Sequence, residues 1–267
     1  MHLERIHDIN DPRLAVYRDV RRNRSAQDQG LFIAEGTTVV RRLFESDFDT
    51  VSVLVSDKKW AGFAEHIPAG THVYRIAYEE ICELVGFRFH AGVIACGRRQ
   101  GNPDLNELLQ NATGRRTIVV APHLTDPENV GALIRIGAAF GVTAAIFGDA
   151  CTDVFSRRAI RVSMANGLFL PIIQTPHMKW VFETLKNHGI RSHATVLDSS
   201  ATSLEDIRCD GDAALVFGNE THGLDEQWAG LCDERVTIPM HGMTDSLNIS
   251  VSAGVFLFWF TCRDRAE

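Results

Sequence analysis

The second half of the chain constrains the fold most, because from residue 116 onward short apolar segments alternate with segments of helical periodicity. The apolar segments are 116–122, 142–149, 170–174, 191–197, 213–219 and 235–240. The segments with helical spacing are 129–141, 156–166, 177–189, 225–231 and 247–262. Buried strands alternating with helices are typical of a parallel sheet covered on both faces. The pattern predicts an α/β domain over residues 116–267, with ligands bound beyond the carboxyl ends of its strands.

The first 98 residues carry a second, smaller α/β pattern. Short strands are expected at 31–36, 50–57, 71–77 and 91–96, with helices at 36–46, 61–67 and 77–86. A basic helix should precede them, over the arginine-rich stretch 13–24. Residues 99–115 are polar, contain Gly, Pro and Asn, and predict a linker with one or two helical turns. The expected organisation is therefore a domain at 1–98, a linker at 99–115 and a domain at 116–267.

The distribution of charge is more informative than its sum. A net charge of -7 argues against nucleic acid as a partner, because phosphate contacts usually come with an excess of Lys and Arg. Two local arginine clusters argue the other way, although such clusters are often ordinary solvated faces. The candidate RNA-contacting residues in them are Arg18, Arg21, Arg22, Arg24, Arg157 and Arg161.

Several common classes of protein are disfavoured. No apolar run approaches the roughly 20 residues of a membrane helix, and the opening MHLERIHDIND has no apolar run of signal-peptide type, so we expect a cytoplasmic protein. The six cysteines form no CxxC pair, and no Cys/His group has zinc-ligand spacing, so no metal is expected. The sequence lacks G-x-G-x-x-G and a P-loop, which disfavours a dehydrogenase or other nucleotide enzyme of the usual kind.

Three polar segments follow predicted strands of the second domain. The first, 126–131 (DPENVG), runs into the helix that carries Arg135, although Asp126 and Pro127 would also be ordinary helix-start residues. The second, 215–224 (LVFGNETHGL), is a buried strand that opens into a polar loop flanked by glycines. The third joins 238–240 (IPM) to 245–248 (DSLN), whose polar residues could equally cap the last helix. Together they indicate a site at one edge of the sheet.

In this order and spacing the three segments resemble the signature motifs of the SpoU family of SPOUT-class RNA 2'-O-ribose methyltransferases. The resemblance covers residues 117–262, and VYRDVRRN, LFIAEG and HAGVIAC within 13–97 resemble the ribosomal-protein-like RNA-binding domain that often precedes the catalytic one. The resemblance implies a SPOUT domain with a trefoil knot, S-adenosylmethionine as cofactor, and methyl transfer to a ribose 2'-hydroxyl of RNA. Ribosomal and transfer RNA are both substrates within the family, so the target stays open.

The resemblance also implies site residues. The implied catalytic residues are Arg135, Asn129, Glu220, Ser246 and Asn248. The implied cofactor-binding residues, acting largely through main-chain groups, are Gly218, Ile238, Leu247, Met240, Val196 and Asn219. A guanidinium with a pKa above about 12 holds its proton, so we expect Arg135 to orient the ribose and stabilise the developing alkoxide rather than act as a base.

The last helical segment bears on assembly. Residues 249–260 are apolar around nearly the whole helix, which a buried core helix or a subunit interface would explain equally well. Members of the family pair through this region, so the resemblance implies a homodimer. An alternative from another class is a non-catalytic RNA-binding protein on the same two-domain scaffold. The presence of Arg135, Glu220 and Asn248 disfavours that alternative.

Overall fold

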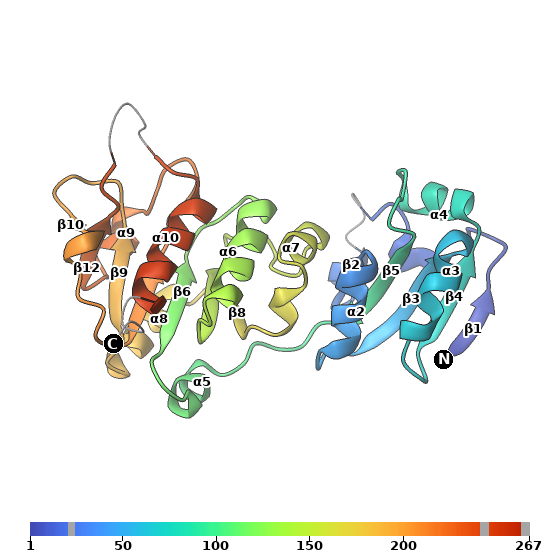
Figure 1. Ribbon diagram of the computed structural model, residues 1–267, viewed down its shortest axis with the longest axis horizontal. Coiled ribbons are helices and arrows are strands. Elements are labelled where there is room, and N and C mark those ends of the chain that lie inside the picture. The colour runs from blue at the N-terminus through green and yellow to red at the C-terminus, as the bar shows by residue number, and fades with distance from the viewer. Residues whose placement is uncertain (21–24, 241–245, 263–267) are drawn as a thin grey trace. The chain divides into compact units, whose positions relative to one another are not determined.

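The computed structural model of the protein describes residues 1–20, 25–240 and 246–262. The chain forms two compact units, and Figure 1 labels most of their helices and strands. Unit 1 consists of Met1–Gly101 and Phe155–Phe169, and unit 2 of Asn102–Val154 and Leu170–Glu267. Unit 2 thus begins inside the stretch expected to be a linker, and a segment expected in the second domain belongs to unit 1.

Unit 1 is built on a five-stranded mixed sheet in the order β1-β4-β3-β5-β2. Its strands are β1 (His2–Arg5), β2 (Leu31–Glu35), β3 (Thr50–Ser56), β4 (His72–Ile76) and β5 (Val93–Arg98). Strands β1, β4 and β3 are parallel neighbours, whereas β5 runs antiparallel to both β3 and β2. The helices are η1 (Pro12–Tyr17), α1 (Ser25–Asp28), α2 (Thr37–Glu45), α3 (Asp57–Phe63), η2 (Ala64–His66), α4 (Tyr78–Val85), α7 (Arg157–Val162) and η3 (Asn166–Leu168).

Alternate residues of these strands serve two separate cores, because successive side chains of a strand point to opposite faces of the sheet. On one face Ile33 and Leu54 pack with residues of η1 and α4. On the other face Phe32 and Val53 pack with α2 and with Ile160, which comes from the segment 155–169. The sheet of unit 1 is therefore covered on both sides.

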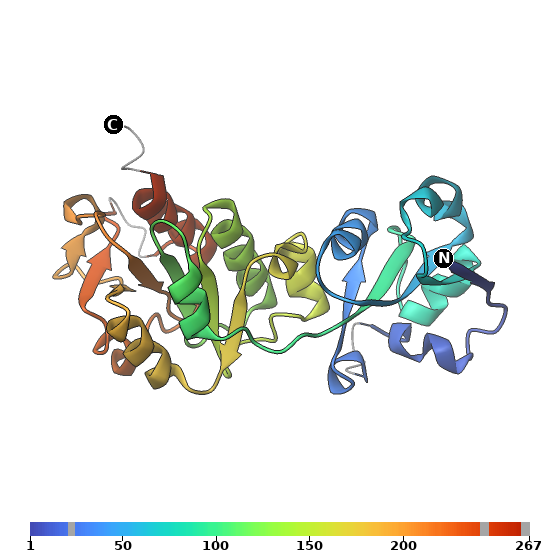
Figure 2. The same ribbon diagram turned by 90° about the horizontal axis from the view of Figure 1, so that it is seen from below.

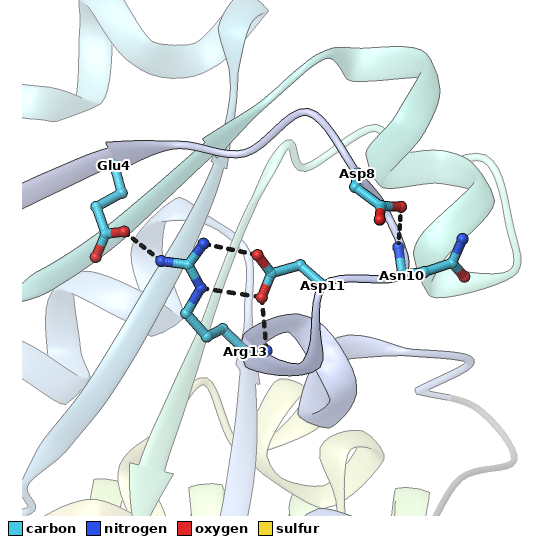
Figure 3. A network of polar contacts seen from close by, with 5 residues as sticks. All are labelled: Glu4, Asp8, Asn10, Asp11 and Arg13. Atoms are coloured by element: carbon cyan, nitrogen blue, oxygen red, sulfur yellow. Dashed lines mark hydrogen bonds and ion pairs between the residues drawn. The ribbon is translucent and has the colours of Figure 1, made fainter.

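The opening of the chain differs from the predicted basic helix over 13–24. The 3-10 helix η1 ends at Tyr17, Arg18 is extended, and Asp19 has a φ of 44°, which no helix accommodates. The side chain of Arg13 is held by neighbouring acidic residues. Its Nε and Nη2 donate to the Asp11 carboxylate at 2.9 and 2.6 Å, and it also forms an ion pair with Glu4 (Figure 3). These hydrogen bonds lower the pKa of Asp11 to about 2.

The segment Phe155–Phe169 (α7 and η3) is attached to unit 1 by buried polar contacts. Arg157 forms an ion pair with the buried Glu35 at the end of β2, and the Arg161 guanidinium lies 3.5 Å from the same carboxylate. From α2, Arg42 donates to the carbonyl of Met164 at 2.8 Å and to the side chain of Asn166 at 2.8 Å. Breaking a buried ion pair leaves an uncompensated charge, so this segment is firmly fixed to unit 1.

Unit 2 is built on a seven-stranded sheet in the order β10-β12-β9-β11-β6-β7-β8, in which every neighbouring pair is parallel. Its strands are β6 (Thr117–Ala121), β7 (Ala144–Gly148), β8 (Ile172–Thr175), β9 (Arg191–Thr195), β10 (Thr202–Ser203), β11 (Ala213–Val216) and β12 (Glu234–Thr237). The helices are α5 (Leu105–Asn111), α6 (Pro127–Ala139), α8 (Met178–Asn187), η4 (Leu204–Asp206), α9 (Glu226–Ala229) and α10 (Ile249–Cys262). The predicted α/β fold with a parallel sheet is confirmed.

Helices cover both faces of the parallel sheet. Helices α5 and α8 share one core with the sheet, in which Leu105 and Leu109 of α5 are almost fully buried. The stretch predicted to be a linker is therefore partly structural, since α5 lies within it. On the other face α10 packs along α6, and the two ribbons lie side by side in both views (Figures 1 and 2). No helix in the described part of the chain is long and apolar enough to cross a membrane.

Candidate active site and cofactor cavity

A cavity of about 510 Å³ lies at the carboxyl ends of β9, β11 and β12. Most of its lining comes from three chain segments at the ends of these strands: 195–197, 217–224, and Ile238 and Met240 together with 246–249. Glu226, Ala229, Arg235, Ser252 and Phe256 complete it. Parallel sheets bind ligands at this edge, beyond the carboxyl ends of the strands. All six predicted cofactor-binding residues line the cavity: Val196, Gly218, Asn219, Ile238, Met240 and Leu247.

The loop after β11 is closed on itself by Asn219. Its backbone N–H donates to the carbonyl of Gly223 at 2.7 Å, and the Gly223 N–H donates back at 3.0 Å. Its side-chain Oδ1 accepts the backbone N–H groups of Thr221 at 2.9 Å and His222 at 3.3 Å. Gly218 allows this closure, because a Cβ there would lie 2.1 Å from the backbone of Gly223. The side chain of Asn219 therefore shapes the loop.

Glu220 anchors this loop to the start of α6. Its Oε1 accepts the backbone N–H of Asp126 at 3.0 Å and the Asn129 amide at 3.2 Å, while its Oε2 accepts the Asn219 amide at 3.1 Å. Burial would raise the pKa of Glu220, but hydrogen bonds from its own backbone, from Asn129 and from the backbone near Asp126 outweigh burial and lower the pKa. The carboxylate is therefore charged and accepts hydrogen bonds on both of its oxygens.

Asn129 links all three polar segments. It lies buried near the start of α6, donates to Glu220 and accepts the Asn248 side-chain amide at 3.3 Å. Asn248 also caps α10, because its Oδ1 accepts the backbone N–H of Ser250 at 2.8 Å. The sequence left open whether Asn248 caps the last helix or belongs to the site. In the structure its side chain both caps α10 and bonds to Asn129. The structure brings together segments more than 90 residues apart in the sequence.

The remaining predicted catalytic residues are placed differently. Ser246 is exposed and lines the cavity beside Leu247. Arg135 is exposed on α6, is not part of the cavity lining, and forms no hydrogen bond or ion pair with the described residues. Six residues beyond Asn129, it lies about 9 Å further along the helix axis. The structure therefore does not bring Arg135 into the hydrogen-bonded group of Asn129, Glu220 and Asn248.

The predicted RNA-contacting arginines also differ in availability. Arg157 is mostly buried and paired with Glu35, so its charge is used inside unit 1, whereas Arg161 keeps almost half of its side chain exposed. Arg18 donates to the carbonyl of Ile9. Arg21, Arg22 and Arg24 lie outside the described residues. We therefore do not retain Arg157 as a phosphate contact.

Two charged residues of the lining were not predicted. Glu226 at the start of α9 and Arg235 on β12 form an ion pair at the cavity. Neither belongs to one of the three polar segments: Glu226 follows the loop after β11 in the sequence, and Arg235 lies on β12 three residues before Ile238. Among the described residues, no group of three or more His, Cys, Asp and Glu side chains could hold a metal ion.

Comparison with known proteins identifies clear relatives. The model of the SpoU rRNA Methylase family matches residues 116–258. An uncharacterized tRNA/rRNA methyltransferase of Mycobacterium bovis is 32% identical over 94% of this chain and 89% of its own length. The 23S rRNA (guanosine-2'-O-)-methyltransferase RlmB of Acinetobacter baylyi is 32% identical over 74% of this chain and 81% of its own length. The AdoMet-bound rRNA methyltransferase of Sinorhizobium meliloti has a similar fold, with a TM-score of 0.83 and 21% identity over 99% of both chains.

Proposed function

The chain belongs to the SpoU rRNA methylase family, and from this membership we propose that it transfers a methyl group from S-adenosylmethionine to a ribose 2'-hydroxyl of RNA. One structural observation carries the proposal. Asn129, Glu220 and Asn248, one from each of the three polar segments, are joined by hydrogen bonds next to a cavity at the carboxyl edge of a parallel sheet. The relatives named above act on ribosomal RNA or carry the broader name tRNA/rRNA methyltransferase, and either RNA class is a candidate substrate.

The cavity fits S-adenosylmethionine in size and in chemistry. A volume of about 510 Å³ falls in the range of ordinary small-molecule sites. Apolar side chains of Val196, Ile238 and Leu247 can cover an adenine ring, whose polar edge main-chain groups can recognise. We propose that these residues, with Gly218, Asn219 and Met240, form the adenosine part of the site.

The chain's own residues have limited tasks in the reaction. When bound, S-adenosylmethionine supplies an activated methyl group whose leaving group is its own sulfur atom. The protein then has to place the ribose oxygen and assist the departure of its proton. We propose that Arg135 orients the ribose and stabilises the developing alkoxide, and that Ser246 contacts the ribose. Asn129, Glu220 and Asn248 act as positioning residues, because they fix the starts of α6 and α10 against the loop after β11.

Three finer features follow from the family and are part of the proposal. Unit 2 contains the trefoil knot of the family, which shapes the cofactor cavity. Unit 1 is a ribosomal-protein-like domain that selects the RNA, with Arg18, Arg21, Arg22, Arg24 and Arg161 as its candidate phosphate contacts. The protein works as a homodimer in the cytoplasm.

Two measurements test this function. The purified protein is incubated with S-adenosylmethionine carrying an isotopically labelled methyl group and with ribosomal or transfer RNA, and the digested RNA is analysed by mass spectrometry. Labelled 2'-O-methylnucleosides are expected, and RNA binding without any methylation would favour a non-catalytic RNA-binding protein. Calorimetric titration with S-adenosylhomocysteine should show binding, whereas a parallel titration with NAD should not.

The RNA-selecting role of unit 1 has its own test. Replacing Arg21 and Arg22 with alanine should reduce the salt dependence of RNA binding, by roughly one unit of slope for each RNA phosphate that the variant no longer neutralises. The affinity for S-adenosylhomocysteine should stay unchanged. An unaltered slope would remove these two arginines from the proposed RNA surface.

A further inference from the structure

The cavity lining includes a charged pair that the proposed adenosine site does not use. Arg235 is the only Lys or Arg among its described lining residues, and the undescribed stretch 241–245 (HGMTD) contains neither. Arg235 pairs with Glu226, which also lines the cavity, and the two side chains are 38% and 76% exposed. A surface ion pair of this kind contributes little to folding stability. Because the pair lines a cavity, ligand binding is the role that its position favours.

Most hydrogen-bond donors of Arg235 and one carboxylate oxygen of Glu226 form no hydrogen bond with the described residues. The described residues provide one hydrogen bond between the two side chains, from Arg235 Nη2 to Glu226 Oε1. A guanidinium has five N–H donors and a carboxylate has two acceptor oxygens. Most donors of Arg235 and the second oxygen of Glu226 therefore remain available to a ligand.

Several neighbouring groups that could compete with this pair are already occupied. In the loop after β11, the backbone N–H groups of Asn219, Thr221, His222 and Gly223 all donate to atoms of the loop itself. The other carboxylate of the lining, Glu220, already accepts hydrogen bonds on both oxygens. Arg235 can therefore donate hydrogen bonds to a ligand carboxylate. Glu226 can accept one from a ligand ammonium group on its second oxygen.

We infer that Arg235 and Glu226 bind the amino-acid end of S-adenosylmethionine, Arg235 holding the carboxylate and Glu226 the ammonium group. This inference rests on the proposed function. An α-amino acid carries one positive and one negative group on adjacent positions, and a paired guanidinium and carboxylate match both charges. Charge-assisted hydrogen bonds of this type are about twice as strong as neutral ones.

The test compares two ligands that differ only at this end. S-adenosylhomocysteine has the amino-acid end, and 5'-deoxy-5'-methylthioadenosine has the same thioether and adenosine without it. In calorimetric titrations of the full chain, Arg235→Met should weaken S-adenosylhomocysteine binding by about 10-fold to 100-fold and change methylthioadenosine binding less than about 2-fold. Glu226→Gln should give a smaller loss with the same selectivity, and Arg235→Lys should restore part of the affinity because it keeps the charge but not the planar fork.

A matched control is available on the neighbouring strand. Arg191 pairs with Glu234 at 3.1 Å but does not line the cavity, so Arg191→Met should leave both affinities unchanged. Equal losses of both ligands in Arg235→Met would overturn the inference and indicate a role in shaping the cavity. An unchanged affinity for S-adenosylhomocysteine with weakened RNA binding would overturn it in favour of a phosphate contact. Failure of the wild type to bind either ligand would overturn the proposed function as well.

Discussion

At the scale of single residues, Arg135 is the most informative position, because its exposure separates two explanations. A structural arginine would bury its stem and pair with an acid, whereas Arg135 is exposed and forms no ion pair with the described residues. Its charge is thus available to a substrate. Arg135 also takes no part in the hydrogen bonds among Asn129, Glu220 and Asn248.

We predict that Arg135→Ala slows single-turnover methylation by on the order of 100-fold to 1000-fold. The melting temperature and the affinity for S-adenosylhomocysteine should remain near those of the wild type. Arg135→Lys should rescue little, because a point charge does not reproduce the planar fork that can hold ribose and phosphate together. Normal turnover in the alanine variant would show that Arg135 is not catalytic. A loss of turnover that is fully explained by unfolding would indicate a structural role.

His193 is a second residue with a measurable signature. It lies buried on β9, its ring centre is 4.9 Å from that of Phe260, and its Nδ1 has no hydrogen-bond partner among the described residues. Burial lowers the pKa of His193 from 6.5 to about 4, although Glu234, 3.7 Å away, opposes the shift. The folded protein therefore keeps this histidine neutral at neutral pH.

The shifted pKa of His193 predicts how stability depends on pH. Between pH 6.5 and about 4 the unfolded chain binds a proton at this position and the folded chain does not. The free energy of unfolding should therefore fall as the pH falls through this window, with His193 contributing up to about 1.4 kcal/mol per pH unit. Urea unfolding of the wild type and of His193→Leu at several pH values measures the contribution, because other titrating groups are common to both. Identical slopes would show that His193 is not buried in its neutral form.

At the scale of elements, apolar periodicity predicted the strands of unit 2 best where every residue is buried, as in β6, β7 and β11. Strand β1 was missed because all four of its residues are exposed and give no apolar signal. Strand β10 was missed because it has only two residues. Helix α5 was assigned to a linker because its sequence is polar apart from a few leucines, two of which reach the core.

The candidate site was only partly predictable for a related reason. The three polar segments stand out because each follows an apolar strand, and their residues do meet at one edge of the sheet. Glu226 and Arg235 carry no such signal, since charged residues on a short helix and on a strand near the sheet edge are ordinary. They are nine residues apart on the consecutive elements α9 and β12, and no local pattern shows that their side chains meet at the cavity.

Helix α10 carries the next prediction. Val251, Val255 and Phe258 are spaced so that they share one helix face, and they remain 53%, 38% and 58% exposed. Together with the partly exposed residues of the adjacent α6, they form an apolar surface that a single chain leaves in water. This surface supports the proposed homodimer.

We expect the wild type to sediment at about twice 29.6 kDa at micromolar concentration. Phe258→Glu should shift the protein toward a monomer, because a charge would be buried in the interface without a partner. Trp180→Glu places the same charge at an exposed apolar residue of α8 and should leave the mass unchanged. A monomeric wild type would contradict the proposal.

At the scale of the whole molecule, the two units are not consecutive in the sequence. The chain leaves unit 2 after Val154, adds a segment to the core of unit 1, and returns at Leu170. Sequence order alone could not show this, because the apolar side chains of that segment would fit either unit. Ile160, Ala165 and Leu168 are buried against α2 and the sheet of unit 1. A fragment that contains unit 2 alone therefore carries an apolar segment without its partner.

The position of α5 in the core predicts that unit 2 needs this helix for its stability. A fragment of residues 113–267 lacks α5, whose Leu105 and Leu109 are each 1% exposed in the core of unit 2. Burial of each leucine contributes about 1.5–3 kcal/mol, so removing both costs an amount comparable to much of the stability of an ordinary domain, roughly 5–15 kcal/mol. A fragment of residues 102–267 keeps the helix and should unfold at a clearly higher urea concentration. Both fragments should self-associate through the uncovered segment 155–169, and Ile160→Ser with Leu168→Ser should reduce this association. Equal urea midpoints for the two fragments would show that α5 is not an integral part of unit 2.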